Sequence, residues 1–383
     1  MKLQCPIEKK CGGCQYLAMN YEKQLSIKQD KIIKLIGKYA RVNKIVGMED
    51  YLHYRNKINA TFKYKKSGII SGVYEEGTHN VLPVDKCFIE DEKADEIIAS
   101  IRKLIPSFKI TVYNEDTGYG LLRHVMIRVG KNSGQIMVVL VTSNPIFPSK
   151  KNFANALKKL HPEITTIVQN INDKKTSMVL GPRNQVMLGK GFIEDTLCGM
   201  KFKISPNSFY QINVEQTEKL YNLAIEYAGL TGKEKVVDAY CGIGTIGLVA
   251  SKKAKQVIGV ELNKEAVKDA IINAKINDCN NIKFYGNDAG KFMVDMAAKG
   301  EKADVVFMDP PRSGSDKPFL DSVIKLAPER IVYISCGPES LARDLDYIVK
   351  NSEYKVEKIT PVDMFPCTEH VETVCLLSKK CPV

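Results

Sequence analysis

Two side chains near the end of the chain could carry out covalent catalysis. Cys336 follows the apolar run 330–334, so its thiol is expected in a loop at the carboxyl end of a strand. Glu372 begins a last apolar strand, and if that strand runs antiparallel, its start lies beside Cys336. A thiolate is a strong nucleophile and a good leaving group, and a carboxylate can remove a proton. Glu369 and His370 are alternative bases, and a buried structural cysteine is the alternative interpretation of Cys336.

A glycine-rich turn indicates a nucleoside-binding site. The turn Asp-Ala-Tyr-Cys-Gly-Ile-Gly (238–244) lies between an apolar strand and a helix, and its glycines let the backbone approach a ligand. Glu261 ends the next strand, where an acidic residue commonly accepts hydrogen bonds from ribose. No third glycine is spaced for a pyrophosphate and no Gly-Lys-Ser/Thr follows, which favours S-adenosylmethionine. A tight turn of any α/β fold is the alternative.

Two more carboxylates follow strands of the same region. Asp309, in Met308-Asp-Pro-Pro-Arg312, ends a strong apolar strand and should face a pocket, because ligands of open α/β sheets bind beyond the carboxyl ends of the strands. Asp288 follows a third strand and could accept a hydrogen bond from an adenine amine.

Three cysteines near the start of the chain have metal-ligand spacing. Cys5, Cys11 and Cys14 form a C-x5-C-x2-C pattern, and Cys87 follows at a distance. Four thiolates can bind zinc or an iron–sulfur cluster, and free thiols are the alternative. Eleven cysteines in a chain without a signal-peptide pattern argue against a disulfide scaffold.

The elements that must position these residues fall into two kinds. From about Lys233 onward, apolar strands alternate with helical patterns such as 264–277, which predicts a parallel sheet covered on both faces. Residues 41–206 read mostly as strands and turns, with hairpins at 66–68 and 130–134. Helices are expected over 21–39 and 214–228, and the acidic run 90–96 is expected to be the solvated face of a helix.

The positive charge is concentrated in the first half of the chain. Residues 1–206 carry 33 basic and 19 acidic side chains, a balance of +14, whereas the rest of the +12 chain balances at −2. Phosphate backbones attract such a surface, and a solvated lysine surface is the alternative. Candidate RNA contacts are lysines on the helix over 21–39 (28, 31, 34 and 38) and the aromatic residues Tyr54, Phe62 and Tyr64. No apolar run is long enough for a membrane helix, so we expect a cytoplasmic protein without membrane contact.

Five motifs resemble the RNA 5-methyluridine methyltransferase family. They are Ser-Phe-Tyr-Gln-Ile-Asn (208–213), Asp-Ala-Tyr-Cys-Gly-Ile-Gly-Thr (238–245), Asp-Pro-Pro-Arg (309–312), Ser-Cys-Gly-Pro (335–338) and His-Val-Glu (370–372). The chain departs from the family at Gly337, where Asn is frequent, and at Cys367, where His is frequent. Many relatives begin with an additional β-barrel domain, which we expect this chain to lack.

The resemblance implies a site, a reaction and an organisation. It makes Cys336 the nucleophile and Glu372 the base for methylation of uracil carbon 5. The residues implied to contact S-adenosylmethionine are Gln211, Tyr240, Glu261, Asp309 and, less firmly matched, Asp288. The cysteines implied to hold a [4Fe-4S] cluster are Cys5, Cys11, Cys14 and Cys87.

The implied substrate is 23S rRNA, with uridine 54 of tRNA and a non-catalytic iron–sulfur RNA-binding protein as alternatives. The expected fold class is α/β, in a monomer. A cysteine-rich iron–sulfur segment (1–40) and a β-rich central RNA-binding domain (41–206) precede a Rossmann-like seven-stranded methyltransferase domain (207–383).

Overall fold

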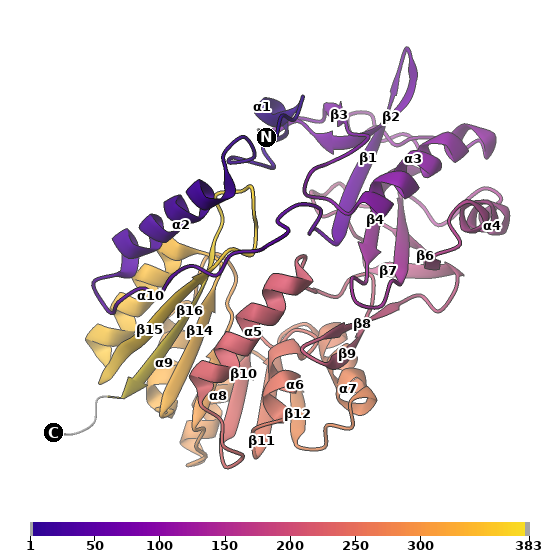
Figure 1. Ribbon diagram of the computed structural model, residues 1–383. Helices are drawn as coiled ribbons and strands as arrows, with labels where there is room; N and C mark the ends of the chain where they lie inside the picture. Colours follow the sequence, from indigo (N-terminus) through magenta and orange to yellow (C-terminus); the bar gives the residue numbers. More distant parts are fainter. Residues whose placement is uncertain (1–2, 380–383) are drawn as a thin grey trace.

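A seven-stranded sheet forms the C-terminal half of the protein in the computed structural model, which describes residues 3–379 (Figure 1). The order is β12-β11-β10-β13-β14-β16-β15, and the first five strands are parallel. These strands are β10 (Lys235–Ala239), β11 (Gln256–Glu261), β12 (Ile282–Gly286), β13 (Val305–Met308), β14 (Arg330–Ser335), β15 (Tyr354–Val362) and β16 (Glu372–Lys379). The predicted seven-stranded sheet is therefore confirmed. Residues 1–2 and 380–383 of the predicted end segments lie outside the described residues.

Helices cover both faces of this sheet, as expected for buried parallel strands. One face packs on α5 (Val214–Ala228), α6 (Thr245–Ser251) and α7 (Lys264–Ile276). The other face packs on α2 (Tyr21–Ile36), α8 (Ala289–Ala298), α9 (Lys317–Leu326) and α10 (Pro338–Asn351). The N-terminal helix α2 thus belongs to the packing of the C-terminal sheet. None of the helices within residues 3–379 is long and apolar enough to cross a membrane.

A second seven-stranded sheet contains the strands expected between residues 41 and 206. Its order is β3-β2-β1-β4-β5-β6-β7, and only β5 and β6 pair in parallel. The strands are β1 (Lys57–Lys65), β2 (Gly68–Tyr74), β3 (Val81–Pro83), β4 (Leu122–Val129), β5 (Ile136–Thr142), β6 (Ile164–Ile171) and β7 (Arg183–Leu188). Both predicted hairpins are present, β1–β2 and β4–β5.

The two faces of this second sheet are covered differently. One face packs on α3 (Glu92–Ser107) and α4 (Lys150–Leu160) through residues such as Ile58 and Phe62. On the other face, Met126, Met137 and Val139 join the core of the C-terminal half. That core also includes a hairpin of β8 (Ile193–Leu197) and β9 (Met200–Ile204).

Several side chains that were predicted to face solvent or RNA are buried. Lys28 is 1% exposed and its Nζ lies 2.5 Å from Asp363 Oδ1, so it is not an RNA contact. Tyr54 and Phe62 are also buried and cannot stack on bases. In the acidic run, Asp95 is buried and accepts a hydrogen bond from the Cys87 backbone N–H (2.9 Å), because its helix packs against the cysteine loop. The prediction of a solvated face was wrong at that position.

Candidate active site

The predicted nucleophile and base lie on neighbouring strands. β14 and β16 are antiparallel, with Ser335 opposite Thr373, so Cys336 directly follows β14 where Glu372 begins β16. The Cys336 side chain is half-buried and Glu372 is 4% exposed. The antiparallel direction of the last strand is confirmed, and it brings the thiol and the carboxylate to the same edge of the sheet.

The loop that follows β13 is in close contact with the loop that contains Cys336. A Cβ atom at Gly337 would lie 2.5 Å from the Arg312 carbonyl oxygen, so the glycine allows a close approach of the two loops. Ser340 donates a hydrogen bond to the same carbonyl (2.9 Å), and Arg343 donates to Ser313 O (2.9 Å). The first turns of α10 therefore fix the Asp-Pro-Pro-Arg loop against the Cys336 loop.

Negative groups crowd together at this edge. Burial raises the pKa of Asp309 to about 7. Burial and then the Asp309 charge raise the pKa of Glu372 to about 8, and Arg312 opposes this shift. Burial, Glu372 and Asp309 raise the pKa of the Cys336 thiol to about 11, again opposed by Arg312. Such an environment disfavours a thiolate by itself and favours a positively charged ligand.

The two alternative bases differ from Glu372 in their surroundings. Glu369 is exposed on the loop before β16, and its backbone N–H donates to Gln15 Oε1 (3.2 Å). His370 is half-buried beside the Phe365 ring, at 6.3 Å between ring centroids. Burial and then Arg312 lower the pKa of His370. Among the three, the position next to Cys336 across the strand pair belongs to Glu372.

The glycine-rich turn adopts a conformation suited to a close ligand. Gly242 has φ +55° and nothing lies within 4 Å of a Cβ atom built there, so the space above the turn is open. Tyr240 also has a positive φ, +66°. The Gly242 N–H donates to Glu261 Oε2 (3.0 Å), and the Asn263 N–H donates to Glu261 Oε1 (2.8 Å). Each carboxylate oxygen retains a lone pair for a further donor.

The other predicted cofactor contacts come from several elements. The half-buried Tyr240 ring lies 4.9 Å from Phe319, and burial raises its pKa to about 12. Asp288 is exposed at the start of α8, where it accepts from the Lys291 N–H (2.9 Å). Gln211 precedes α5, is 9% exposed and accepts from Asn56 Nδ2 (3.1 Å) through its backbone oxygen. These residues therefore lie at the carboxyl ends of adjacent parallel strands. In the order of the sheet, Asp288 follows β12, Glu261 ends β11, Tyr240 follows β10 and Asp309 follows β13.

Three further residues were not singled out from the sequence. Asp238 is buried and accepts from the Gly247 N–H (2.7 Å), so it fixes α6 to β10, and its Oδ1 has no partner among the described residues. Arg312 is the positive charge that acts on Cys336 and Glu372. Phe209 is 66% exposed two residues before Gln211. The signals were present in the motifs: an acid before the turn, the arginine of Asp-Pro-Pro-Arg and an aromatic residue beside Gln211.

The four N-terminal cysteines gather around one cavity. Cys5, Cys11, Cys14 and Cys87 line a space of about 260 Å³. Burial raises the pKa of the Cys87 thiol to about 12, and burial and the neighbouring cysteines raise the pKa of Cys14. Within residues 3–379, no three His, Cys, Asp or Glu side chains are placed to bind one metal ion together. The predicted metal site is therefore not shown.

Known proteins are similar to this chain over nearly its whole length. The family model described as tRNA (uracil-5-)-methyltransferase matches residues 20–380. The chain is 41% identical over 381 residues to an uncharacterized RNA methyltransferase of Halalkalibacterium halodurans, covering 98% of this chain and 83% of the relative. It is 45% identical over 382 residues to one of Clostridium acetobutylicum, with coverages of 98% and 83%.

A solved structure is similar over nearly the whole chain. It is the crystal structure of the Pyrococcus abyssi tRNA (uracil-54, C5)-methyltransferase in complex with S-adenosyl-L-homocysteine. The TM-score is 0.80 at 30% sequence identity, and the match covers 95% of this chain and 85% of that one.

Proposed function

The chain belongs to the tRNA (uracil-5-)-methyltransferase family, and from this premise we propose that it methylates carbon 5 of a uridine in RNA with S-adenosylmethionine as methyl donor. The observation that carries the proposal is the position of Cys336 beside Glu372 at the carboxyl edge of the sheet. Carbon 5 of uracil is a weak nucleophile, so the reaction needs a group that adds to the ring and a base that later removes a proton.

Cys336 is the proposed nucleophile. Its sulfur forms a bond to carbon 6 of uracil, and the electron pair of the 5,6 double bond moves into an enolate. Carbon 5 then attacks the donor's methyl carbon, and the donor leaves as S-adenosylhomocysteine. Glu372 removes the carbon 5 proton, the 5,6 double bond re-forms, and the Cys336 sulfur departs. The thiol proton goes to solvent before the addition, the sulfur departs as a thiolate, and Glu372 passes the carbon 5 proton to solvent, so every bond made to the enzyme is broken again.

The charges of the site support this order of events. Without ligands, the raised pKa of Cys336 keeps its thiol protonated near neutral pH. The donor carries a positive sulfonium, which suits an edge crowded by Asp309 and Glu372. Its charge favours both the thiolate of Cys336 and the ionised carboxylate of Glu372 that accepts the proton. The raised pKa of Glu372 makes its carboxylate a stronger base than an exposed glutamate.

The proposed donor site is the glycine-rich turn and its neighbours. Gly242 leaves room for the donor, and Glu261 offers acceptors for ribose hydroxyls. Tyr240, Asp288, Asp309 and Gln211 complete the set, with Asp288 proposed for the adenine amine. The Asp288 carboxylate also caps α8, which leaves its second oxygen for that contact.

The proposed substrate is 23S rRNA, supported by the resemblance of the motifs and of the cysteine spacing. Uridine 54 of tRNA is the second candidate, supported by the similarity to the Pyrococcus abyssi enzyme. We also propose that Cys5, Cys11, Cys14 and Cys87 hold a [4Fe-4S] cluster, which their shared cavity supports. The proposed methyl transfer needs no electron, so the cluster has a structural role.

The proposal is tested by incubating the protein with labelled S-adenosylmethionine and, separately, rRNA and tRNA isolated from cells that lack the gene. We expect 5-methyluridine at a defined position of one RNA, found by mass analysis, and complete loss of activity in Cys336→Ala. Cys198→Ala is the matched control, because this half-buried cysteine lies on the β8–β9 turn. Wild-type rates in Cys336→Ala would overturn the mechanism, and a methylated cytosine would overturn the substrate.

A further inference from the structure

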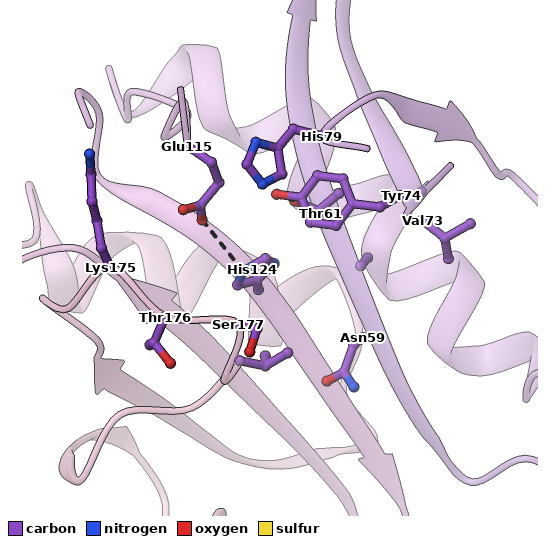
Figure 2. Close-up of a pocket in the computed structure, with 13 residues that line it drawn as sticks. Asn59, Thr61, Val73, Tyr74, His79, Glu115, His124, Lys175, Thr176 and Ser177 are labelled. Carbon is purple, nitrogen blue, oxygen red and sulfur yellow. Dashed lines mark hydrogen bonds and ion pairs between the residues drawn. The ribbon is translucent and has the colours of Figure 1, made fainter. Parts of the chain in front are cut away.

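A cavity of about 620 Å³ lies on the second sheet, on the face opposite α3 and α4, and Figure 2 shows the side chains that line it. The alternation along β1 creates it: Ile58 and Phe62 point into the core under the helices, whereas Asn59 and Thr61 line the cavity. Its volume is in the range of sites for small ligands, about 300–1,000 Å³. None of its lining residues belongs to the methyl-transfer site described above.

We propose that this cavity binds a second nucleotide of the RNA substrate, one that is not methylated and whose base carries an amino group. The inference rests on the proposed function, because it assumes that RNA is the substrate. RNA-binding proteins take up bases that have left their stack by combining aromatic rings, base-edge hydrogen bonds and cations for the phosphate. The cavity contains all three.

Three polar side chains offer hydrogen bonds inside the cavity. Asn59 Oδ1 is buried without a partner among residues 3–379, and such an acceptor requires a donor such as an amino group. Glu115 is held by Arg123 through both oxygens, with Nη2 at 2.9 and 2.8 Å. His124 lies 3.8 Å from Glu115, and because burial lowers its pKa to about 4, its ring is neutral and can donate and accept at once.

Aromatic rings and a lysine complete the cavity. The Tyr74 ring lies 5.8 Å from the His79 ring and 6.2 Å from the His124 ring, so these rings form an aromatic wall for a base (Figure 2). His79 is oriented by Asp116 (2.8 Å). Lys175 is exposed on the loop that closes the other side, and it makes no ion pair with any residue between 3 and 379. Its charge is thus available for a phosphate.

The experiment measures RNA binding separately from methylation. The probes are an unmodified tRNA transcript and a transcribed fragment of 23S rRNA, and the proteins are full-length Lys175→Ala and Tyr74→Leu. We expect each variant to weaken binding by about tenfold, as for the loss of one phosphate contact or one stacked base. The value of kcat at saturating RNA should not change, because these side chains are not at the reacting atoms. Lys151→Ala, an exposed lysine on α4 behind the sheet, is the matched control.

A thermodynamic cycle identifies the nucleotide. Each nucleotide of the bound transcript is replaced in turn by an abasic one. At one position other than the methylated uridine, the replacement should weaken binding to the wild type. The same replacement should not weaken the binding of Tyr74→Leu below the affinity that this variant has for the intact transcript. Equal affinities of wild type, Lys175→Ala and Lys151→Ala would overturn the proposal, and this test does not depend on the fold of Tyr74→Leu. If the wild type methylates neither RNA but the cavity variants lose binding, the proposed reaction fails and the nucleotide site stands.

Discussion

At the residue scale, the proposed active site combines groups that oppose one another's ionisation. Glu372, Asp309 and Cys336 each acquire a negative charge at high pH, and burial penalises every one of these charges. Arg312 compensates only partly. Ionisation of these groups destabilises the protein without a ligand, and a bound cationic donor offsets this cost. The same side chains therefore affect both the stability of the protein and its proposed function.

Replacing Glu372 by glutamine should separate addition from elimination. Cys336 can still add to carbon 6 and carbon 5 can still be methylated, but no carboxylate removes the carbon 5 proton. We expect a protein–RNA adduct that resists denaturation by detergent and turnover reduced by at least about a hundredfold, in the range of a lost general base. Gel electrophoresis with labelled RNA measures the adduct. The double variant Cys336→Ala/Glu372→Gln should form none, and free 5-methyluridine produced by Glu372→Gln at the wild-type rate would exclude Glu372 as the base.

The same substitution should alter stability in a pH-dependent way. The pKa of Glu372 is about 8 in the folded protein, above its ordinary value of 4.5, so the folded state loses stability as pH rises from 4.5 through 8. Glutamine carries no charge to bury. We expect the free energy of unfolding of Glu372→Gln to exceed that of the wild type by on the order of 3 kcal/mol at pH 9. Near pH 4 the two free energies of unfolding should be equal. Urea unfolding at both pH values measures this, with exposed Glu369→Gln as the control. If Glu372→Gln and the wild type differed equally in free energy of unfolding at both pH values, the raised pKa of Glu372 would be contradicted.

At the scale of elements, periodicity was sufficient to predict which strand ends meet. The apolar runs that end before Asp309 and Cys336 became adjacent parallel strands, and the last strand entered antiparallel beside them. What periodicity could not show is which polar residues the packing of distant elements buries. Lys28 lies on a helix with a charged pattern, yet its partner Asp363 is 335 residues away. Asp95 is likewise buried by another segment, the loop of Cys87, which its own helical pattern does not indicate.

The glycine-rich turn offers a matched pair of substitutions. Gly242 and Gly232 both have positive φ values, +55° and +91°, and neither has an atom within 4 Å of a built Cβ. Alanine should therefore cost a similar 1–2 kcal/mol of stability at each, on the order expected for a left-handed residue. Only Gly242→Ala should also weaken S-adenosylmethionine binding, by about tenfold or more, since its methyl group enters the proposed donor site. Calorimetric titration measures the affinity. Equal donor affinities of the two variants would show that the donor binds elsewhere.

At the scale of the whole molecule, the N-terminal segment is attached to the loop that precedes Glu372, the proposed base. The Tyr16 N–H donates to Cys367 O (2.9 Å), and the Cys367 N–H donates to Gln24 Oε1 (2.9 Å). Lys28 donates to the Phe365 carbonyl (3.0 Å) besides its ion pair with Asp363. Cys367 also packs in one apolar cluster with Cys14 and Cys87. The proposed iron–sulfur segment thus supports residues 363–370, which lead directly into Glu372.

The cysteine cavity adjoins the nucleotide cavity as well, because Asn59 and Val73 line both. A cluster held by the four cysteines would therefore stiffen one wall of the RNA site and the loop that carries the base. This position would allow a group that takes no part in the proposed methyl transfer to affect it.

Cys14→Ser should remove iron and sulfide from the purified protein and lower kcat by up to about a hundredfold, the effect expected when a base is misplaced by about 1 Å. Affinity for S-adenosylmethionine should remain at the wild-type value, because the glycine-rich turn contacts neither cavity. Iron and sulfide analysis, kcat and calorimetric titration measure the three quantities, and Cys198→Ser is the control. Iron content equal to wild type would exclude Cys14 as a ligand. Loss of iron with full activity would mean that the loop before Glu372 is positioned without a cluster. The hydrogen bonds with Tyr16, Gln24 and Lys28 would then be sufficient, because they involve the backbone of that loop and none of the four thiols.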